Sequence, residues 1–483
     1  MTYKNLYIFL SVVGLCILLL GRCTPPTNIG GLTANITEHV ASQDGDTLKV
    51  IITSNEDWKA TTNDSWLQPN MDQGIANGRV KLTIKVQPNL TNKDRVGTVS
   101  IATSSSSISI KVTQLHGDVD AERYQYNIPV IFHVLYNKEY EKELVADNKP
   151  AEGLEYFPLN SSTLQEIIEE VNKIYEGMPK EPQDWGFFRH AAYGHRPFLN
   201  LNLKFSLATK DPSGKTLNPI GIVRHEINER EVDPILVMND KKGGVYHTMS
   251  YPVTDYVNVF IFPFATKGDS NYVTLGIAHL PYGTTNNQIA GLKNFDKRVS
   301  KFDSYNHCAV INAKVFEPLM QRRLPLQSRA PIQTIAHELG HIVGLFHVFS
   351  EKKDDSGVLT NNEQNTCEDT DYCSDTPSYN RYKYEENNKI IIRSGIGALN
   401  REQISGLLNR FTCAQQNILS TNVMDYDWTY GDRFELQQKE RVRQVLYYSM
   451  CIPGLKLVDP PHATRSDMEP TPVVSTCRST ILK

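Results

Sequence analysis

Three of the 13 histidines in this 483-residue chain fall within one eleven-residue stretch, HELGHIVGLFH, at 337–347. His337 and His341 are four residues apart, and on an α-helix this spacing places both imidazoles on one face, one turn apart. Two imidazoles in this arrangement can bind one metal ion. Glu338 reaches the side of the same site, close enough to take a proton from a metal-bound water. The stretch therefore predicts a metal centre with a carboxylate base.

His347 follows His341 by six positions, which a continuous helix would carry around to a different face. The chain must turn between them, and Gly344 can adopt a positive φ there without a steric penalty. Three neutral imidazoles with one open position form a catalytic zinc site, so His337, His341 and His347 are the predicted zinc ligands. A buried helix with incidental histidines is the alternative, which five fixed identities in eleven positions make improbable. A methyl group at Gly340, inside the helix, should be tolerated if packing leaves room.

The composition is that of a soluble globular protein, with 40% hydrophobic residues, 22% charged residues and a mean hydropathy of -0.38. A chain of this length holds two or three domains, each able to bury its own core. The net charge is -4 and no long basic or acidic run is present. Nucleic acid is therefore not an expected partner.

The first 23 residues form a separate segment. Lys4 precedes the apolar run LYIFLSVVGLCILLLG, which is typical of a secretory signal and short for a stable membrane-spanning helix. The next box, LGRC, resembles a bacterial lipoprotein signal, with Arg22 in place of the usual small residue. The resemblance implies a signal peptide at 1–23, cleaved so that Cys23 carries lipid. An uncleaved N-terminal anchor is the alternative. With either, we expect a location in the cell envelope, at the outer membrane or cell surface.

Cysteine usage agrees with export. Of eight cysteines, Cys16 would be lost with the signal and Cys23 would be lipidated, which leaves six. In an oxidising compartment six cysteines permit up to three disulfides, and free buried thiols are the alternative. No CxxC pair is present, so a zinc cluster built from cysteines is not expected.

A linker-like stretch at 24–32 leads into a predicted all-β sandwich at 33–116. Runs such as LKVIIT, VKLTIKV and SISIKVTQ alternate apolar and polar residues between Asn, Asp and Gly turns. NEDWKATTNDSWLQPN and the strands after it resemble the Bacteroidetes-associated carbohydrate-binding often N-terminal (BACON) domain. The resemblance suggests a glycan partner, with Trp58 and Trp66 able to stack on sugars. Core packing of both tryptophans is the preferred interpretation, with the domain acting as a spacer.

Residues 121–452 predict an α/β or α+β domain, and 453–483 form a tail without an assignment. Apolar runs predict strands, and apolar residues at 3–4 spacing predict a helix with Ser161 or Ser162 as its N-cap. The expected strands are 126–136, 201–208, 257–264 and 307–316, and the expected helices are 161–177 and 331–344. A strand, a helix, further strands and the histidine helix make a catalytic half.

The histidine stretch matches H-E-x-x-H-x-x-G-x-x-H, the metzincin signature, whose second element is a tight turn with a methionine beneath the zinc. STNVMDYDW supplies that turn, with Met424. IPVIFHVLY, DPSGKTLNPIGIVR and FELQQKERVRQVL support a resemblance to the pappalysin or cytophagalysin branch of these peptidases over about 124–452. It implies an α+β metzincin domain with a mixed twisted sheet, a zinc helix, a Met-turn and a C-terminal helix. It also implies that Tyr426 steadies the transition state, with an ordinary aromatic beside the turn as the alternative.

The same family provides two further expectations. DYCSDTP matches its calcium-binding loop, which implies that Asp371, the carbonyl of Cys373 and Thr376 bind calcium, and a solvated acidic loop is the alternative. Cys367 and Cys413 stand where the family has a disulfide between this loop and the Met-turn.

The residues together predict a zinc-dependent endopeptidase that acts on extracytoplasmic proteins or peptides. Glu338 would accept the proton of the attacking water and deliver it to the leaving amine, and Tyr426 would hydrogen-bond the oxyanion. The substrate would lie extended along an edge strand above the zinc helix. SEKKDDSGVLTNNEQN, at 350–365, looks like an insertion that reshapes the cleft edge. A glycan-binding or structural surface lipoprotein is the alternative, and it leaves the intact histidine motif and Met-turn unexplained.

Overall fold

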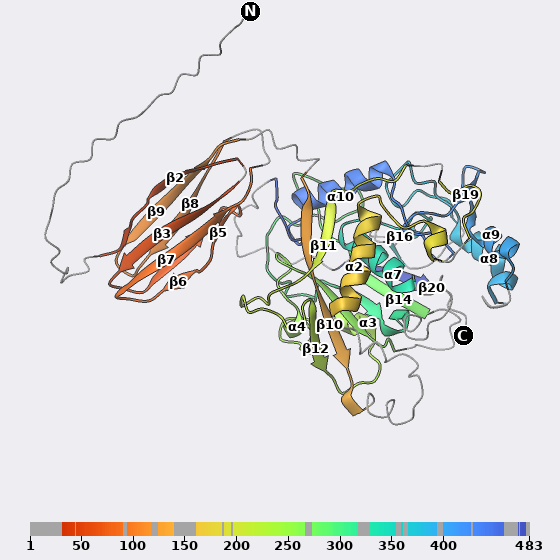
Figure 1. The fold of residues 1–483 in the computed structure, drawn as a ribbon, viewed down its shortest axis with the longest axis horizontal. Coiled ribbons are helices and arrows are strands. Elements are labelled where there is room, and N and C mark those ends of the chain that lie inside the picture. The colour runs from red at the N-terminus through yellow and green to blue at the C-terminus, as the bar shows by residue number, and fades with distance from the viewer. Residues whose placement is uncertain are drawn as a thin grey trace, which may run out of the picture.

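The structure is a computed structural model. It describes residues 31–43, 45–89, 94–116, 124–139, 161–185, 188–194, 197–265, 273–316, 329–353, 359–360, 366–393, 399–426, 428–457, 472 and 474–479. The predicted signal peptide, at 1–23, and its predicted lipidation site, Cys23, lie outside the described residues. Among the helices that are described, none has the length and apolarity needed to cross a bilayer. The predicted fold class is confirmed, because a strand-rich body precedes a larger α+β body (Figure 1).

The N-terminal body consists of two sheets, with strand orders β1-β3-β7-β5 and β2-β9-β8-β4-β6. Alternation decides which residues face inward: Leu48, Val50 and Ile52 of β3 are buried, whereas Lys49 between them is exposed. The strands are β1 Thr33–Ala34, β2 Glu38–Ala41, β3 Asp46–Ser54, β4 Trp58–Thr62, β5 Leu67–Pro69, β6 Gln73–Gly74, β7 Gly78–Val86, β8 Arg95–Ala102 and β9 Ser107–Gln114.

Trp58 and Trp66 belong to the core of this sandwich. Only 1% of Trp58 and 2% of Trp66 is exposed. Each indole lies against a glycine on a neighbouring strand, where a methyl group on Gly74 would be 2.3 Å from the Trp58 ring and one on Gly97 would be 2.6 Å from the Trp66 ring. The core interpretation is therefore correct, and neither indole is available to stack on a sugar.

The larger body is built on a mixed sheet with the order β11-β10-β13-β15-β14-β20, in which β12 also pairs with β10. The strands β10 to β13 and β15 pair in parallel, β14 is antiparallel to β15, and β20 is antiparallel to β14. Their bounds are β10 Tyr126–Tyr136, β11 Leu203–Leu207, β12 Ile222–Glu226, β13 Val257–Phe262, β14 Val273–His279, β15 Ala309–Asn312 and β20 Val474–Ser479. The tail, for which no structure was predicted, thus contributes the strand at one margin of the sheet.

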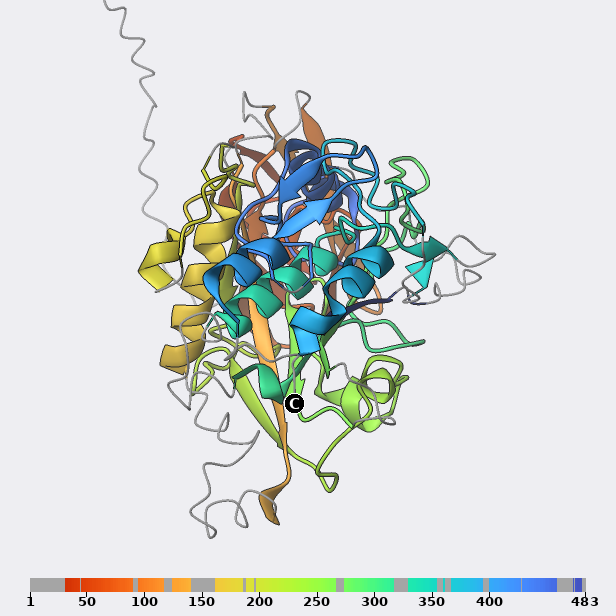
Figure 2. The same cartoon turned by 90° about the vertical axis from the view of Figure 1, so that its right-hand side faces the viewer.

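The helices α2, Ser161–Tyr175, and α7, Ala330–Ile342, contact each other and the sheet (Figure 1). α2 buries its apolar residues at the expected spacing, and the Ser161 hydroxyl, in its first residue, donates to the Ile220 carbonyl. In the turned view the sandwich lies behind the larger body (Figure 2). The remaining elements are η2 Pro182–Trp185, α3 Pro234–Met238, α4 Val245–Met249, η3 Ala313–Phe316, β16 Lys352–Lys353, β17 Leu359–Thr360, α8 Arg381–Arg393, α9 Arg401–Leu407, β18 Asn409–Phe411, β19 Asn417–Leu419 and α10 Leu436–Tyr448.

Candidate metal centre

The turn required to bring back the third histidine is present at the end of α7. Gly344 has a φ of +95°. The N–H of Gly344 donates to the carbonyl of His341, and the N–H of Leu345 donates to the carbonyl of Gly340, each over 2.9 Å. These two bonds form a Schellman motif, in which a left-handed residue ends the helix and redirects the chain. Gly344 thus directs the chain so that His347 returns to the other two histidines.

The three imidazoles converge through their Nε2 atoms. Nε2 of His341 lies 3.0 Å from Nε2 of His337 and 3.2 Å from Nε2 of His347. All three side chains are buried. Within the described part of the chain they are the one group of three or more His, Cys, Asp or Glu residues close enough to hold a metal ion.

Each imidazole is oriented by an acceptor at its other nitrogen. Nδ1 of His337 bonds to the carbonyl of Val423, Nδ1 of His341 to the carbonyl of Leu345, and Nδ1 of His347 to the Glu351 carboxylate, each over 2.8 Å. Because these partners accept, each Nδ1 carries the proton and each Nε2 presents a lone pair to the other two rings. Three converging lone pairs repel one another unless a cation lies among them. Zn–N bonds of about 2.0–2.1 Å in a tetrahedral site would separate ligand nitrogens by about 3.3 Å, close to the observed spacing, so the residues fit zinc.

Burial keeps the imidazoles of His337 and His341 neutral. Burial, and then the proximity of His347, lowers the pKa of His337 to about 3. Burial, followed by His337 and His347, holds the pKa of His341 well below its usual value. Metal ligation requires neutral imidazoles, so at neutral pH protons do not compete for these two nitrogens.

The carboxylate of Glu338 is held between α7 and the sheet. Only 1% of Glu338 is exposed, and its carboxylate lies directly against the backbone of Gly276 on β14. A methyl group on Gly276 would be 2.4 Å from Oε1 of Glu338 and 2.7 Å from its Cγ and Cδ. A side chain at this point of β14 would therefore displace the carboxylate from the place that it occupies.

Met424 lies directly beneath the helix that carries the histidines. A methyl group on Gly340 would be 2.4 Å from Sδ of Met424, which is fully buried. The condition for a tolerated methyl group at Gly340 is therefore not met unless Met424 moves. The same turn holds His337 through the carbonyl of Val423, and its Met424 carbonyl accepts a bond from the N–H of Val348 over 3.3 Å. The Met-turn thus supports the chain on both sides of the site.

Tyr426 lies beside the imidazoles. Its ring centre is 4.5 Å from that of His347 and 5.8 Å from that of His337. Only 5% of Tyr426 is exposed. Its ring therefore lies against the imidazoles of two of the three predicted metal ligands.

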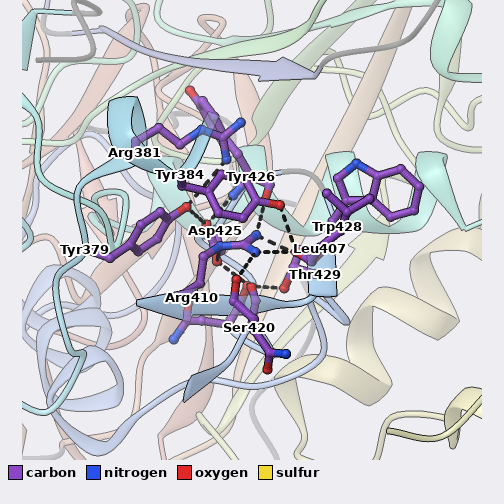
Figure 3. A network of polar contacts seen from close by, with 12 residues as sticks. Tyr379, Arg381, Tyr384, Leu407, Arg410, Ser420, Asp425, Tyr426, Trp428 and Thr429 are labelled. Carbon is purple, nitrogen blue, oxygen red and sulfur yellow. Dashed lines mark hydrogen bonds and ion pairs between the residues drawn. The ribbon is translucent and has the colours of Figure 1, made fainter. Parts of the chain in front are cut away.

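A buried ion pair between Arg410 and Asp425 stabilises the Met-turn (Figure 3). The Arg410 guanidinium donates from Nε to Oδ2 of Asp425 over 3.1 Å and from a terminal nitrogen to the Tyr426 carbonyl over 3.0 Å. The Tyr379 hydroxyl donates to the other oxygen of Asp425 over 2.6 Å. Arg410 and Asp425 are both nearly inaccessible. These bonds fix the backbone between Met424 and Tyr426, because buried polar groups that are satisfied hold a single geometry.

The expected disulfide between Cys367 and Cys413 is present, with the two Cα atoms 5.6 Å apart. Cys308, Cys373 and Cys451 are buried free thiols. The side chain of Cys477 lies outside the described ones. Both interpretations of the cysteines therefore apply, to different members of the set.

The three expected calcium ligands lie together. The Thr376 hydroxyl lies against the Asp371 carboxylate and 2.6 Å from the carbonyl oxygen of Cys373, and the N–H of Cys373 donates to Asp371 over 2.9 Å. Asp371 and Thr376 are buried, so the loop is not a solvated one. Burial raises the pKa of Asp371 to about 8. A buried carboxylate with this pKa is one that a cation would stabilise in its charged form.

Two residues of the site were not singled out from the sequence. Glu351 lies in the stretch interpreted as an insertion at the cleft edge, yet its carboxylate bonds to Nδ1 of His347. An acidic residue four positions after the third histidine was the available signal. Gly276 gave no comparable signal, because its role depends on a contact with Glu338 across 62 positions of sequence.

The sequence comparisons agree with both expected resemblances. Residues 325–447 match the M43 peptidase family, described as pregnancy-associated plasma protein-A. Residues 56–115 match the BACON family, described as a putative binding domain, N-terminal. No curated protein sequence matches this chain. The second half of the chain thus contains a metallopeptidase segment.

Three of the solved structures that match show weak similarity to this chain. WR4, a C. elegans MSP family member, is 15% identical, covers 18% of this chain and 97% of its own, and has a TM-score of 0.15. A protein from Bacteroides thetaiotaomicron is 10% identical over 20% of this chain and 98% of its own, with a TM-score of 0.14. A Bacteroides ovatus GH5 xyloglucanase is 11% identical over 86% of this chain and 99% of its own, with a TM-score of 0.17. At these TM-scores the similarities carry no argument.

Proposed function

We propose that this chain, whose residues 325–447 match the M43 peptidases, is a zinc-dependent endopeptidase of the metzincin type. The observation that carries the proposal is the convergence of three buried Nε2 atoms, two of them from α7, the helix that also carries the buried carboxylate of Glu338. His337, His341 and His347 would hold the zinc, which supplies Lewis acidity to a water molecule and to the scissile carbonyl. The substrate class is peptide bonds in extracytoplasmic proteins or peptides.

The residues of the chain have separate tasks in this reaction. Glu338 accepts a proton from the attacking water and delivers it to the leaving amine. Its burial between α7 and Gly276 limits the carboxylate to one position, so that little reorganisation is needed during the reaction. Tyr426 donates a hydrogen bond to the developing oxyanion, a contribution worth a few kcal/mol in comparable sites.

The surroundings of the site fit these tasks. The acceptors at the three Nδ1 atoms keep every Nε2 lone pair directed at the metal position. Met424 packs against Gly340 under the zinc helix and supports its position. Calcium bound by Asp371, Thr376 and the carbonyl of Cys373 would stabilise the adjoining loop.

The location follows from the N-terminal segment. We propose that the chain is exported, cleaved before Cys23 and anchored by lipid at that residue to the cell envelope, which the apolar run and the LGRC box support. The BACON match supports a glycan contact by the N-terminal body, through residues other than the two buried tryptophans.

Substitution of Glu338 tests the reaction. Glu338→Ala should keep the zinc and the fold but lose hydrolysis of a mixed peptide library by several orders of magnitude, because the attacking water loses its base. Glu402→Ala, which removes an exposed glutamate of α9, is the matched control and should retain the parental rate. Zinc content by elemental analysis and cleavage by mass spectrometry give the two readouts. A parental rate in Glu338→Ala would remove Glu338 from the mechanism.

The alternative function, a glycan-binding or structural surface lipoprotein, is supported only by the BACON match. It predicts that the zinc-loaded parent cleaves no member of the library and that a metal chelator changes nothing. Chelator-sensitive cleavage by the parent would therefore decide against it.

A further inference from the structure

The C-terminal strand β20 lies along the strand that borders the proposed catalytic site. β20, Val474–Ser479, pairs antiparallel with β14, Val273–His279, and ends the order of the sheet (Figure 1). It also contacts the zinc helix α7. The pairing joins residues separated by about 200 positions in the chain.

The register carries β20 past the catalytic carboxylate. Cys477 is the Cα partner of Gly276, and Gly276 is the residue against which the Glu338 carboxylate packs. Two positions further along β14, Ala278 pairs with Ser475, and only 4% of Ser475 is exposed. The backbone of the tail therefore occupies the margin of the sheet at the level of the site.

The pairing is irregular at the same place. The register shifts between Thr274 and Gly276, so that Leu275 is an extra residue on β14. Bulges of this kind interrupt a ladder locally and are common next to active sites, where they redirect side chains. A glycine directly after the bulge leaves room for the Glu338 carboxylate.

An extended substrate needs the same hydrogen-bonding groups that β20 uses. A peptide added to a sheet margin pairs with the free N–H and C=O groups of the outermost strand, and in the described sheet these groups of β14 face β20. Two segments cannot pair with one edge at the same time. Occupation by the tail and productive binding of a peptide are therefore mutually exclusive.

We propose that the C-terminal strand, Val474–Ser479, is a built-in competitor that covers the β14 edge and must leave before a peptide substrate binds there. The proposal rests on the proposed peptidase function and names how that site is regulated. A site whose edge is open for about a tenth of the time binds substrate with an apparent KM about tenfold higher than the open site. Release of the strand should lower KM and leave kcat unchanged.

Two double variants of the full chain provide the test. Thr476→Pro with Cys477→Pro removes two consecutive backbone N–H groups, and because these alternate in direction along a strand, one of them faces β14. Thr476→Val with Cys477→Ser keeps both N–H groups and is the matched control. Zinc content and circular dichroism establish that each protein is folded, and amide hydrogen exchange of Val273–His279 should be faster in the proline variant alone.

The probe is a fluorescein-labelled peptide with the sequence of residues 473–480, synthesised with serine in place of Cys477. Fluorescence anisotropy should give binding to the proline variant at least tenfold tighter than to the parent or the control. KM for a mixed peptide substrate should fall by a similar factor in the proline variant.

Equal binding of the labelled peptide to all three proteins, or to none, would overturn the inference. Unchanged hydrogen exchange in the proline variant would also overturn it, because the strand would then not protect β14. If the peptide binds as expected but no zinc-loaded variant cleaves the substrate, the peptidase function fails and the competition for the edge stands. The binding and exchange readouts thus separate the two hypotheses.

Discussion

Removal of the Glu351 carboxylate should weaken zinc binding without touching a zinc ligand. The carboxylate accepts the Nδ1 proton of His347 over 2.8 Å, and its side chain is 8% exposed. Its other oxygen, Oε2, has no hydrogen-bond partner in the part of the chain that is described. A buried carboxylate that is only half satisfied is costly, and the positive charge of an occupied zinc site offsets that cost.

The magnitude follows from the hydrogen bond. In Glu351→Ala the buried Nδ1–H of His347 loses its acceptor, which costs about 1–3 kcal/mol. Since 1.4 kcal/mol is a factor of ten, zinc affinity should fall by about 10–100-fold, the range found when such partners are lost from other metal sites. Glu351→Gln keeps an oxygen that can accept the bond but removes the charge. Charge-assisted bonds are about twice as strong as neutral ones, so the loss should be smaller, about threefold to tenfold.

Competition with a chromogenic chelator measures the zinc dissociation constant directly. The matched control is Glu368→Ala, which removes an exposed glutamate from the same region and should bind zinc like the parent. A further check is the order of the three proteins. Zinc affinity should be highest in the parent, lower in Glu351→Gln and lowest in Glu351→Ala. Parental affinity in a folded Glu351→Ala would refute the view that this carboxylate orients His347.

Four further predictions follow from the geometry around the site. Gly276→Ala should displace the Glu338 carboxylate, so hydrolysis should fall by about a hundredfold while zinc content stays unchanged. Gly344→Val adds about 1–3 kcal/mol of backbone strain and a contact 2.5 Å from a Val445 methyl carbon, so it should weaken zinc binding in a chelator titration. Gly340→Ala, without that strain, should instead lower the melting temperature with zinc still bound. Burial raises the pKa of Asp371 to about 8, above its unfolded value of about 3.9. Without calcium, the free energy of unfolding should therefore fall as pH rises between these two values. Thermal melts should show that Ca²⁺ restores the free energy of unfolding at pH 8.

Features set by short-range spacing could be predicted from the sequence. The spacing of His337 and His341 places both on one helical face, and a glycine at 344 permits the turn that returns His347, so the structure has this turn where it was expected. The alternation of β3 likewise predicted which residues face the core of the sandwich. In each case the feature depends only on residues that are close together in the sequence.

Features set by packing between distant segments could not be predicted. The four-residue spacing of His347 and Glu351 is a local signal, but the position of Glu351 also depends on a distant contact, in which its N–H donates to the hydroxyl of Thr370 over 3.1 Å. The contact of a methyl group at Gly340 with Met424 arises from an approach of two segments 84 positions apart, which helix periodicity does not encode. Local patterns specify which side chains can share a face, whereas tertiary contacts decide what lies opposite that face.

The tail shows the same limit with a functional consequence. A short run such as VSTCRS is compatible with a strand, but a strand is stable only where an open edge accepts it. That edge belongs to β14, whose identity as the strand beside Glu338 depends on the whole sheet order. A strand edge that binds peptide substrates must have free N–H and C=O groups. Such an edge pairs with any extended segment that can reach it. A peptidase with such an edge must therefore either prevent its own chain from reaching the edge or use that contact, and we propose that the pairing of β20 with β14 is the second solution.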